Sequence, residues 1–189
     1  MNRMLIAGVG NIFLGDDGFG VEVAGRLARA DLPGWVRVAD YGISGMHLAY
    51  DLAEGYETTI LIDAAPRGDM PGTVYVIEPE IGKVPANRGN PLLDAHGMQP
   101  DVVFGMLDLL GADAGRVLVV GCEPASVEEG MGLSAPVAAA VDEAVRIVLD
   151  LVRAASTDAS AEPADSHQTQ EDGSATVAGR GSDVPWHTR

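Results

Sequence analysis

The stretch that decides the fold is Gly8-Val9-Gly10-Asn11-Ile12-Phe13-Leu14-Gly15-Asp16-Asp17-Gly18-Phe19-Gly20. Residues 4–7 before it form a short apolar run, which is typical of a buried strand. After it, apolar residues recur at helical spacing between Val21 and Ala28. The sequence therefore predicts a strand, a glycine-rich loop and a helix. In an open α/β sheet, the loop that leaves the carboxyl end of a strand is where ligands bind.

This loop allows two interpretations. A dinucleotide-binding loop would follow the pattern G-x-G-x-x-G, but Phe13 occupies the position of the third glycine. Asp40, at the end of the predicted second strand, is the candidate for the acid that binds a ribose in that interpretation. Asp16 and Asp17 instead place two negative charges in the loop, which disfavours phosphate and favours a metal ion or an activated water. Both interpretations stay open on spacing alone.

Length, charge and cysteine content exclude several classes of protein. The chain has 189 residues, enough for one domain with an appended tail. Its 28 acidic and 12 basic residues give a net charge of −16, so we expect neither nucleic acid nor an anionic membrane as a partner. The single cysteine, Cys122, excludes an internal disulfide. No membrane-spanning segment and no signal peptide are visible, so a cytoplasmic protein is expected.

Hydrophobic periodicity predicts alternating strands and helices along most of the chain. A strand at 73–77 follows the strand at 58–63 after only about ten residues without a helical pattern, which is too short for a parallel crossover and predicts an antiparallel strand. Beyond Ala154 the sequence becomes polar, so we predict a folded domain at 1–154 and a disordered acidic tail at 155–189. The other predicted strands span 36–40 and 116–120. One predicted helix follows the glycine-rich loop and ends near residue 30, and three more span 46–54, 100–111 and 134–154.

Acidic residues follow the first three predicted strands. Asp16 and Asp17 follow the first, Asp40 ends the second and Asp63 ends the third, so parallel strands would gather them at one edge of the sheet. His96 lies in a long loop that could reach that edge. Carboxylates with an imidazole suit a divalent cation, whereas crowded carboxylates without a metal suit acid/base catalysis.

Each candidate also has a purely structural interpretation. Asp16 and Asp17 are suitable helix caps, and Asp40 and Asp63 are suitable turn residues. A loop histidine such as His96 is more often hydrogen-bonded than metal-bound. Cys122 has no basic neighbour in sequence and is interpreted as a small buried apolar residue.

The order of the motifs resembles the [NiFe]-hydrogenase maturation endopeptidases. The resemblance covers about residues 3–152 and begins with the glycine-rich stretch quoted above. Four further segments carry it: Asp40-Tyr41-Gly42-Ile43-Ser44-Gly45-Met46, Ile62-Asp63-Ala64 with the loop histidine His96, Gly121-Cys122-Glu123-Pro124, and Gly132-Leu133-Ser134.

The resemblance implies a three-layer α/β/α fold with a mostly parallel five-stranded sheet, order 2-1-3-5-4, and an antiparallel fourth strand. It implies an aspartic-type endopeptidase that removes the C-terminal extension of a hydrogenase large-subunit precursor after nickel insertion. The implied metal contacts fall on Asp17, Asp63 and His96, and Asp40 matches another acid linked to activity. The nickel would be carried by the substrate, and a monomer is expected.

These considerations combine into one hypothesis. Asp17, Asp63 and His96 recognise nickel already seated in the precursor, and Asp17 or Asp40 helps a water attack the scissile carbonyl. We therefore expect Asp17, Asp40 and Asp63 to be catalytic. The alternative is a non-catalytic α/β domain that binds a nucleotide or a metal.

Overall fold

The computed structural model describes residues 3–79 and 115–159, and these form a sheet covered by helices. The five strands are β1 (Met4–Val9), β2 (Val36–Gly42), β3 (Thr58–Ala64), β4 (Val74–Ile77) and β5 (Arg116–Cys122). The helices are the 3-10 helix η1 (Gly15–Gly18), α1 (Phe19–Leu27), α2 (Gly45–Ala53) and α4 (Ala135–Ala159). The predicted helix at 100–111 lies outside the described residues. Among those that are described, no helix has the length and apolar character needed to span a membrane.

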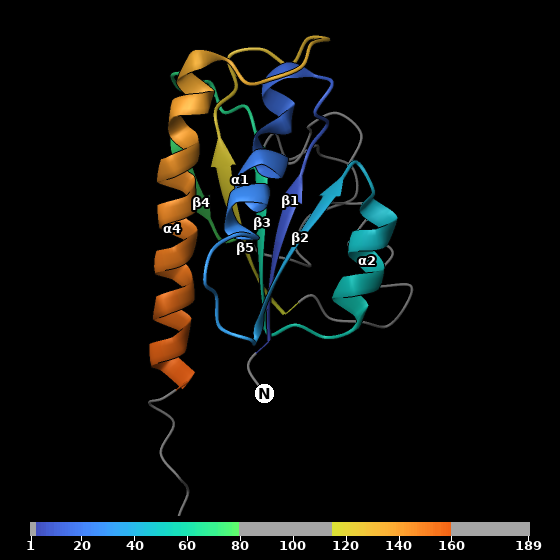
Figure 1. Cartoon of the computed structure of the whole chain (residues 1–189), viewed down its shortest axis with the longest axis vertical. Coiled ribbons are helices and arrows are strands. Elements are labelled where there is room, and N and C mark those ends of the chain that lie inside the picture. The colour runs from blue at the N-terminus through green and yellow to red at the C-terminus, as the bar shows by residue number, and fades with distance from the viewer. Residues whose placement is uncertain (1–2, 80–114, 160–189) are drawn as a thin grey trace, which may run out of the picture.

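The sheet has the strand order β2-β1-β3-β5-β4, as expected. β1 pairs in parallel with β2 and β3, β3 pairs in parallel with β5, and β4 pairs antiparallel with β5. The short connection between β3 and β4 therefore reverses the chain direction, which confirms the prediction made from its length. Because four strands are parallel, their carboxyl ends meet at one rim of the sheet, where the arrowheads of β1, β2, β3 and β5 point in Figure 1.

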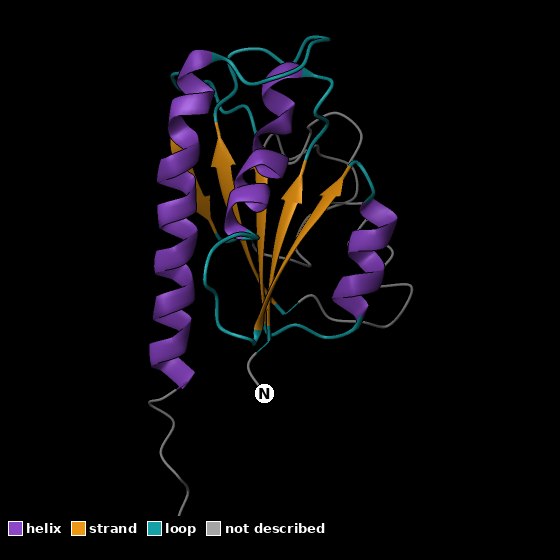
Figure 2. Ribbon diagram, viewed as in Figure 1, coloured by secondary structure: helices purple, strands orange, loops and turns teal. Residues whose placement is uncertain are grey.

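Side-chain alternation along β1 divides the core between two faces. Met4 and Ile6 pack on one face with α1 and α4, whereas Leu5 and Ala7 pack on the other face with α2. All six residues of β1 are buried, as expected for a strand covered on both sides. Figure 2 shows α1 and α4 in front of the sheet and α2 beside β2.

The largest differences from the predicted boundaries are at the ends of two helices. The helix after the first loop ends at Leu27 rather than near residue 30, because the chain tightens into turns there. The last helix continues to Ala159, five residues beyond its predicted end. Hydroxyls of Ser156 and Thr157 bond to backbone carbonyls four residues earlier, at Val152 and Arg153, and Ala155 packs against the core, so the helix continues into the polar sequence. The remainder of the predicted tail lies outside the described residues.

Glycines allow the first loop and α1 to pack directly against the strand ends. A Cβ atom on Gly20 would overlap the backbone carbonyl oxygens of Ile62 and Val9, and one on Gly8 would overlap the carbonyl oxygen of Gly20. Gly10 has φ +130 and lies against the backbone of Asp17. These contacts are between backbone atoms, so a side chain at these positions displaces the loop from β1 and β3.

The carboxylate of Asp16 holds the loop that follows β5. It accepts hydrogen bonds from the amides of Ala125 at 2.8 Å, Ser126 at 3.1 Å and Ser134 at 2.6 Å, and from the Ser134 hydroxyl at 2.9 Å. Burial by itself raises the pKa of Asp16, but the hydrogen bonds from Ser134, Ala125 and Ser126 outweigh it and lower the pKa below its ordinary value. Asp16 therefore does not cap the helix that follows it, contrary to the structural interpretation above.

We expect Gly20→Ala to destabilise the fold by about 3 kcal/mol or more, because backbone atoms of Val9 and Ile62 must move to admit the methyl group. Gly25→Ala is the matched control, since it lies in the same helix and its new methyl group would have nothing within 4 Å. It should stabilise the protein by up to about 1 kcal/mol through helix propensity. Urea denaturation measures both, and equal effects of the two variants would contradict the packing described here.

We expect Asp16→Ala to cost about 2 kcal/mol or more at pH 7, because three backbone amides and one hydroxyl of the loop after β5 lose their charged acceptor. The lowered pKa means that this stabilisation is complete above about pH 4 and is lost as the pH falls through the folded-state value. The difference between wild type and variant in free energy of unfolding should therefore shrink in acid. Glu129→Ala, an exposed acid in the same loop, should change stability by less than about 0.5 kcal/mol at either pH. If the difference in free energy of unfolding between wild type and Asp16→Ala were the same at pH 7 and pH 2, this role of Asp16 would be contradicted.

Candidate functional site

Two carboxylates meet at the carboxyl rim of the sheet. Asp17 lies in η1, directly after β1, and Asp63 is the penultimate residue of β3. β1 and β3 are adjacent parallel strands, and η1 packs against β3. The negative charge of Asp17 acts on the carboxyl group of Asp63, so the two side chains form an interacting pair.

The position of Asp17 is fixed by the loop that carries it. Its side chain is buried, and its Oδ2 accepts a hydrogen bond of 2.7 Å from the amide of Asn11. Its own amide donates to the carbonyl of Leu14, which closes the turn of η1. Asp16 points to the loop after β5 and Asp17 points to β3, so two neighbouring acids have different partners and different roles.

Asp63 is held in an environment that favours its protonated form. Burial first, and then the negative charge of Asp17, raise its pKa well above the ordinary value, while a backbone hydrogen bond from Ala64 acts in the opposite direction. The side chain nevertheless keeps partial exposure to solvent. This environment suits a carboxyl group that gives up its proton when a positive charge approaches.

Asp40 lies on the other side of β1 and is exposed. Gly8 of β1 is the register partner of both Asp40 and Ile62, so β1 separates Asp40 from Asp63 at the rim. Its Oδ1 accepts a hydrogen bond of 2.8 Å from the amide of Gly42, at the point where the register of β2 shifts. Asp40 borders an open cavity of about 320 Å³, which is lined also by Arg37, Ala39, Tyr41, His47, Tyr50 and Asp51.

The third predicted metal contact, His96, lies outside the described residues. Within residues 3–79 and 115–159, no group of three or more histidine, cysteine or acidic side chains is arranged to hold a metal ion. A cation bound at this pair would have oxygen ligands from Asp17 and Asp63 and would need further donors from elsewhere. The role of His96 remains a prediction.

Two residues at the rim have roles that sequence reasoning did not find. Glu123, directly after β5, is buried and its carboxylate accepts hydrogen bonds from the amides of Arg67 at 2.6 Å and Gly68 at 3.2 Å. It therefore fixes the loop that follows Asp63. The only sequence signal was an acid placed between a buried strand and Pro124.

Tyr75 of β4 is the second such residue. Its ring lies over Gly121, where a Cβ atom would overlap it, and its hydroxyl donates a hydrogen bond to the carbonyl oxygen of Ala65. Burial, and then the charges of Glu123 and Asp63, raise the pKa of the Tyr75 hydroxyl, which keeps it neutral. Tyr75 thereby ties β4 to the segment that follows Asp63.

Cys122 takes no part in this chemistry. It is buried in the core between the sheet and the helices α1 and α4. Burial raises the pKa of its thiol to about 12, so the nucleophilic thiolate is absent at neutral pH. The interpretation of Cys122 as a small apolar residue is therefore confirmed.

The first loop does not form a phosphate-binding nest. Its amides already donate to protein acceptors: that of Gly10 to Gly42, that of Asn11 to the Asp17 carboxylate and that of Gly15 to Gly130. The Asp17 carboxylate itself occupies an anion position at the Asn11 amide. The geometry thus favours a site that attracts cations over one that binds a nucleotide.

Comparison with known proteins agrees with this geometry. The sequence profile of the hydrogenase maturation protease family matches residues 21–151. The hydrogenase expression/formation protein HupD of Rhodobacter capsulatus is 34% identical over 150 residues, which cover 76% of this chain and 70% of that protein. The hydrogenase 2 maturation protease of Escherichia coli (strain K12) is 32% identical over 158 residues, which cover 83% of this chain and 94% of that protein.

Solved structures give the same result. The hydrogenase maturating endopeptidase HybD from E. coli superimposes with a TM-score of 0.66 at 30% identity, covering 80% of this chain and 93% of that one. The hydrogenase 2 maturation peptidase from a Thaumarchaeota archaeon gives a TM-score of 0.62 at 31% identity, with 80% and 99% covered. The chain therefore belongs to the hydrogenase maturation protease family and is an endopeptidase.

Proposed function

We propose that this endopeptidase removes the C-terminal extension of a [NiFe]-hydrogenase large-subunit precursor after nickel insertion, and that it recognises the nickel already bound in that precursor. The observation that carries the proposal is the pairing of Asp17 with Asp63 at the carboxyl rim, with the charge of Asp17 acting on Asp63. A divalent cation brought by the substrate satisfies both carboxylates, which otherwise repel each other when both are ionised.

The proposed recognition of nickel rests on the placement of Asp17 beside Asp63 at the rim, where burial and the charge of Asp17 raise the pKa of Asp63. In the free enzyme Asp63 favours its proton, so the pair carries less than its full negative charge. An approaching Ni²⁺ stabilises the ionised form and replaces that proton, and His96 is the proposed third contact. A precursor without nickel offers no such charge, so Asp63 keeps its proton and the pair gains no contact with the precursor. The enzyme thereby selects loaded precursor over empty precursor.

Hydrolysis requires a water that attacks the scissile carbonyl and a route for the proton that it releases. Asp17 or Asp40 is the proposed base, and the proton passes finally to the leaving amine. Asp17 is buried beside Asp63, whereas Asp40 is exposed across β1, next to an open cavity of about 320 Å³. The substrate chain would therefore take a different path over the rim depending on which of these two acids is the base.

We expect Asp17→Asn to reduce processing at least about 100-fold, because the amide carries no charge for the cation or the water. Its Oδ1 can still accept the hydrogen bond from Asn11, so the fold should persist. The assay uses purified nickel-loaded precursor, with mass spectrometry to detect loss of the C-terminal extension, and circular dichroism to check folding. Asp31→Asn, an exposed acid away from the rim, is the control and should process normally. Undiminished processing by Asp17→Asn would remove Asp17 from the site.

We expect Asp63→Asn to stabilise the folded protein at pH 7 while blocking processing. The raised folded-state pKa of Asp63 means that ionisation favours the unfolded chain, so this residue costs stability increasingly as the pH rises above about 4. The neutral amide removes that cost and keeps the backbone hydrogen bond. Thermal unfolding at pH 7 and pH 3 measures the effect, which should be an increase in Tm at pH 7 that vanishes at pH 3. A lower Tm for Asp63→Asn at pH 7 would contradict the environment described for Asp63.

A further inference from the structure

The large apolar side chains that remain exposed gather at the carboxyl rim of the sheet. In the described part of the chain there are eight, and only Tyr50 of α2 and Val76 of β4 lie elsewhere. The other six lie in the segments that follow β1, β2, β3 and β5. We call them the apolar collar, which consists of Ile12, Phe13, Ile43, Met46, Met70 and Met131.

Exposure in the collar is high. Phe13 is 62% exposed, Met70 is 79% exposed and Met131 is 76% exposed. The amino end of the sheet is different, because there charged side chains pair with each other, as Arg116 does with Glu78 at 2.8 Å. Single exposed apolar residues are ordinary, but a group at one end of a protein marks a surface that another molecule covers.

Hydrogen bonds hold the backbones of the loops that carry Phe13, Met70 and Met131, which keeps these side chains on the outside. The segment before η1 and the loop after β5 pair through a bridge between Leu14 and Gly130, and the Gly130 amide donates to the Phe13 carbonyl at 2.9 Å. The Asp16 carboxylate holds the loop after β5, and the Glu123 carboxylate holds the loop after β3. The exposed apolar side chains are therefore displayed by a preorganised frame.

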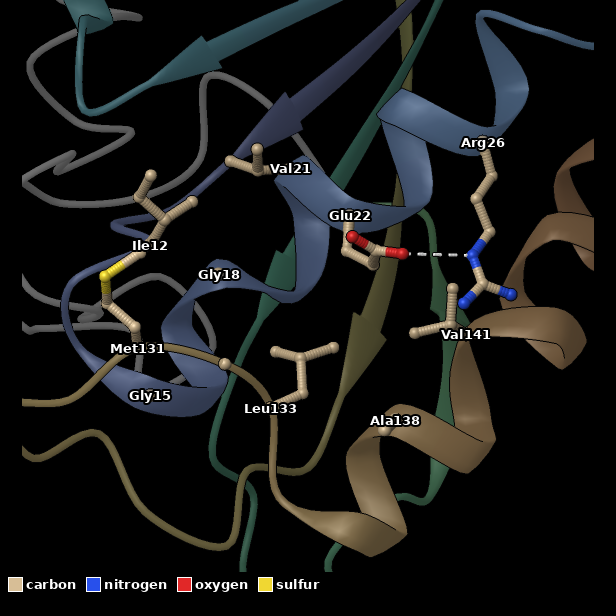
Figure 3. Close-up of a pocket in the computed structure, with 11 residues that line it drawn as sticks. Ile12, Gly15, Gly18, Val21, Glu22, Arg26, Met131, Leu133, Ala138 and Val141 are labelled. Atoms are coloured by element: carbon tan, nitrogen blue, oxygen red, sulfur yellow. Dashed lines mark hydrogen bonds and ion pairs between the residues drawn. The ribbon is translucent and has the colours of Figure 1, made fainter.

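An apolar pocket adjoins the collar on the side of α1 and α4. It has a volume of about 350 Å³ and is lined mainly by small and apolar residues, among them Ile12, Val21, Met131, Leu133 and Val141. Figure 3 shows Ile12 and Met131 at one end of the pocket, while Arg26 and its partner Glu22 lie at the other end. The pocket is large enough for one or two apolar side chains of a bound protein.

We infer that the apolar collar and this pocket are the docking surface for the hydrogenase precursor, which binds through an apolar surface of its own beside its metal centre. This inference rests on the proposed function. The collar segments leave the same rim of the sheet as Asp17 and Asp63, so a protein that presents a cation to this pair also comes against the collar. Three of the six collar residues are methionines, whose flexible side chains adapt to an irregular partner surface.

Charge at the same rim argues for a protein partner rather than a membrane. The exposed acids Asp69, Glu128 and Glu129 lie in the same two loops as Met70 and Met131. Together with the net charge of −16, they repel an anionic lipid surface. An apolar protein surface with basic residues around it complements this arrangement.

The test measures steady-state processing of nickel-loaded precursor by the full chain. Ile43→Thr and the double variant Phe13→Ser with Met131→Gln remove collar contacts, and each should raise KM about 10-fold or more, equivalent to about 1.4 kcal/mol, with kcat within about 2-fold of wild type. Val76→Thr is the matched control for Ile43→Thr, because it removes an exposed β-branched apolar side chain away from the rim. It should leave KM and kcat unchanged.

Other results overturn the inference. Unchanged KM in the collar variants, or a loss of kcat at constant KM, would show that these side chains do not dock the substrate. If wild type forms a dimer in sedimentation velocity and the collar variants do not, the collar instead binds a second copy of this chain. A direct binding measurement separates the two proposals: if wild type binds the precursor without cleaving it and the collar variants bind at least about 10-fold more weakly, the docking surface stands and the proposed cleavage fails.

Discussion

The contact of Gly20 with the backbone of β1 and β3 is the constraint on which the site depends. Because neither Gly8 nor Gly20 has a side chain, the start of α1 lies directly against the carbonyl groups of Val9 and Ile62. This close approach brings η1 to the end of β3, and so places Asp17 beside Asp63. A larger residue at either glycine would move η1 away from β3 and separate the two carboxylates. The proposed contact with a cation would then be lost.

Acidic residues at this rim have two separate roles, and their partners decide which. Asp16 and Glu123 are buried and accept hydrogen bonds from backbone amides, so their charge is satisfied inside the protein. Burial, and then the charge of Asp17, raise the pKa of Asp63, and a backbone hydrogen bond from Ala64 offsets them only in part. Neighbouring carboxylates thus have different roles: Asp16 and Glu123 anchor the loops, and Asp17 and Asp63 are the proposed contacts for the substrate. The anchored loops in turn display part of the apolar collar at the same rim.

The sequence was sufficient for the sheet but not for the partners at its rim. The run at 58–63 is apolar on both faces, which correctly predicted a central parallel strand, and the short connection to β4 predicted its direction. Local pattern could not distinguish Asp16 from Asp17, because the partners of Asp16 lie more than a hundred residues away in the chain. The same is true of Glu123 and Tyr75, whose contacts depend on how the rim loops pack. His96 belongs to the resemblance alone, and its place in the site stays a prediction.

The central claim is that the carboxylate pair recognises the nickel carried by the substrate. The most direct measurement compares initial rates of processing for nickel-loaded precursor and for the same precursor purified without nickel, at equal concentrations and with the mass of the product as readout. The account predicts that the loaded form is processed at least about 100-fold faster, equivalent to about 2.7 kcal/mol. Equal rates for the two forms would contradict it.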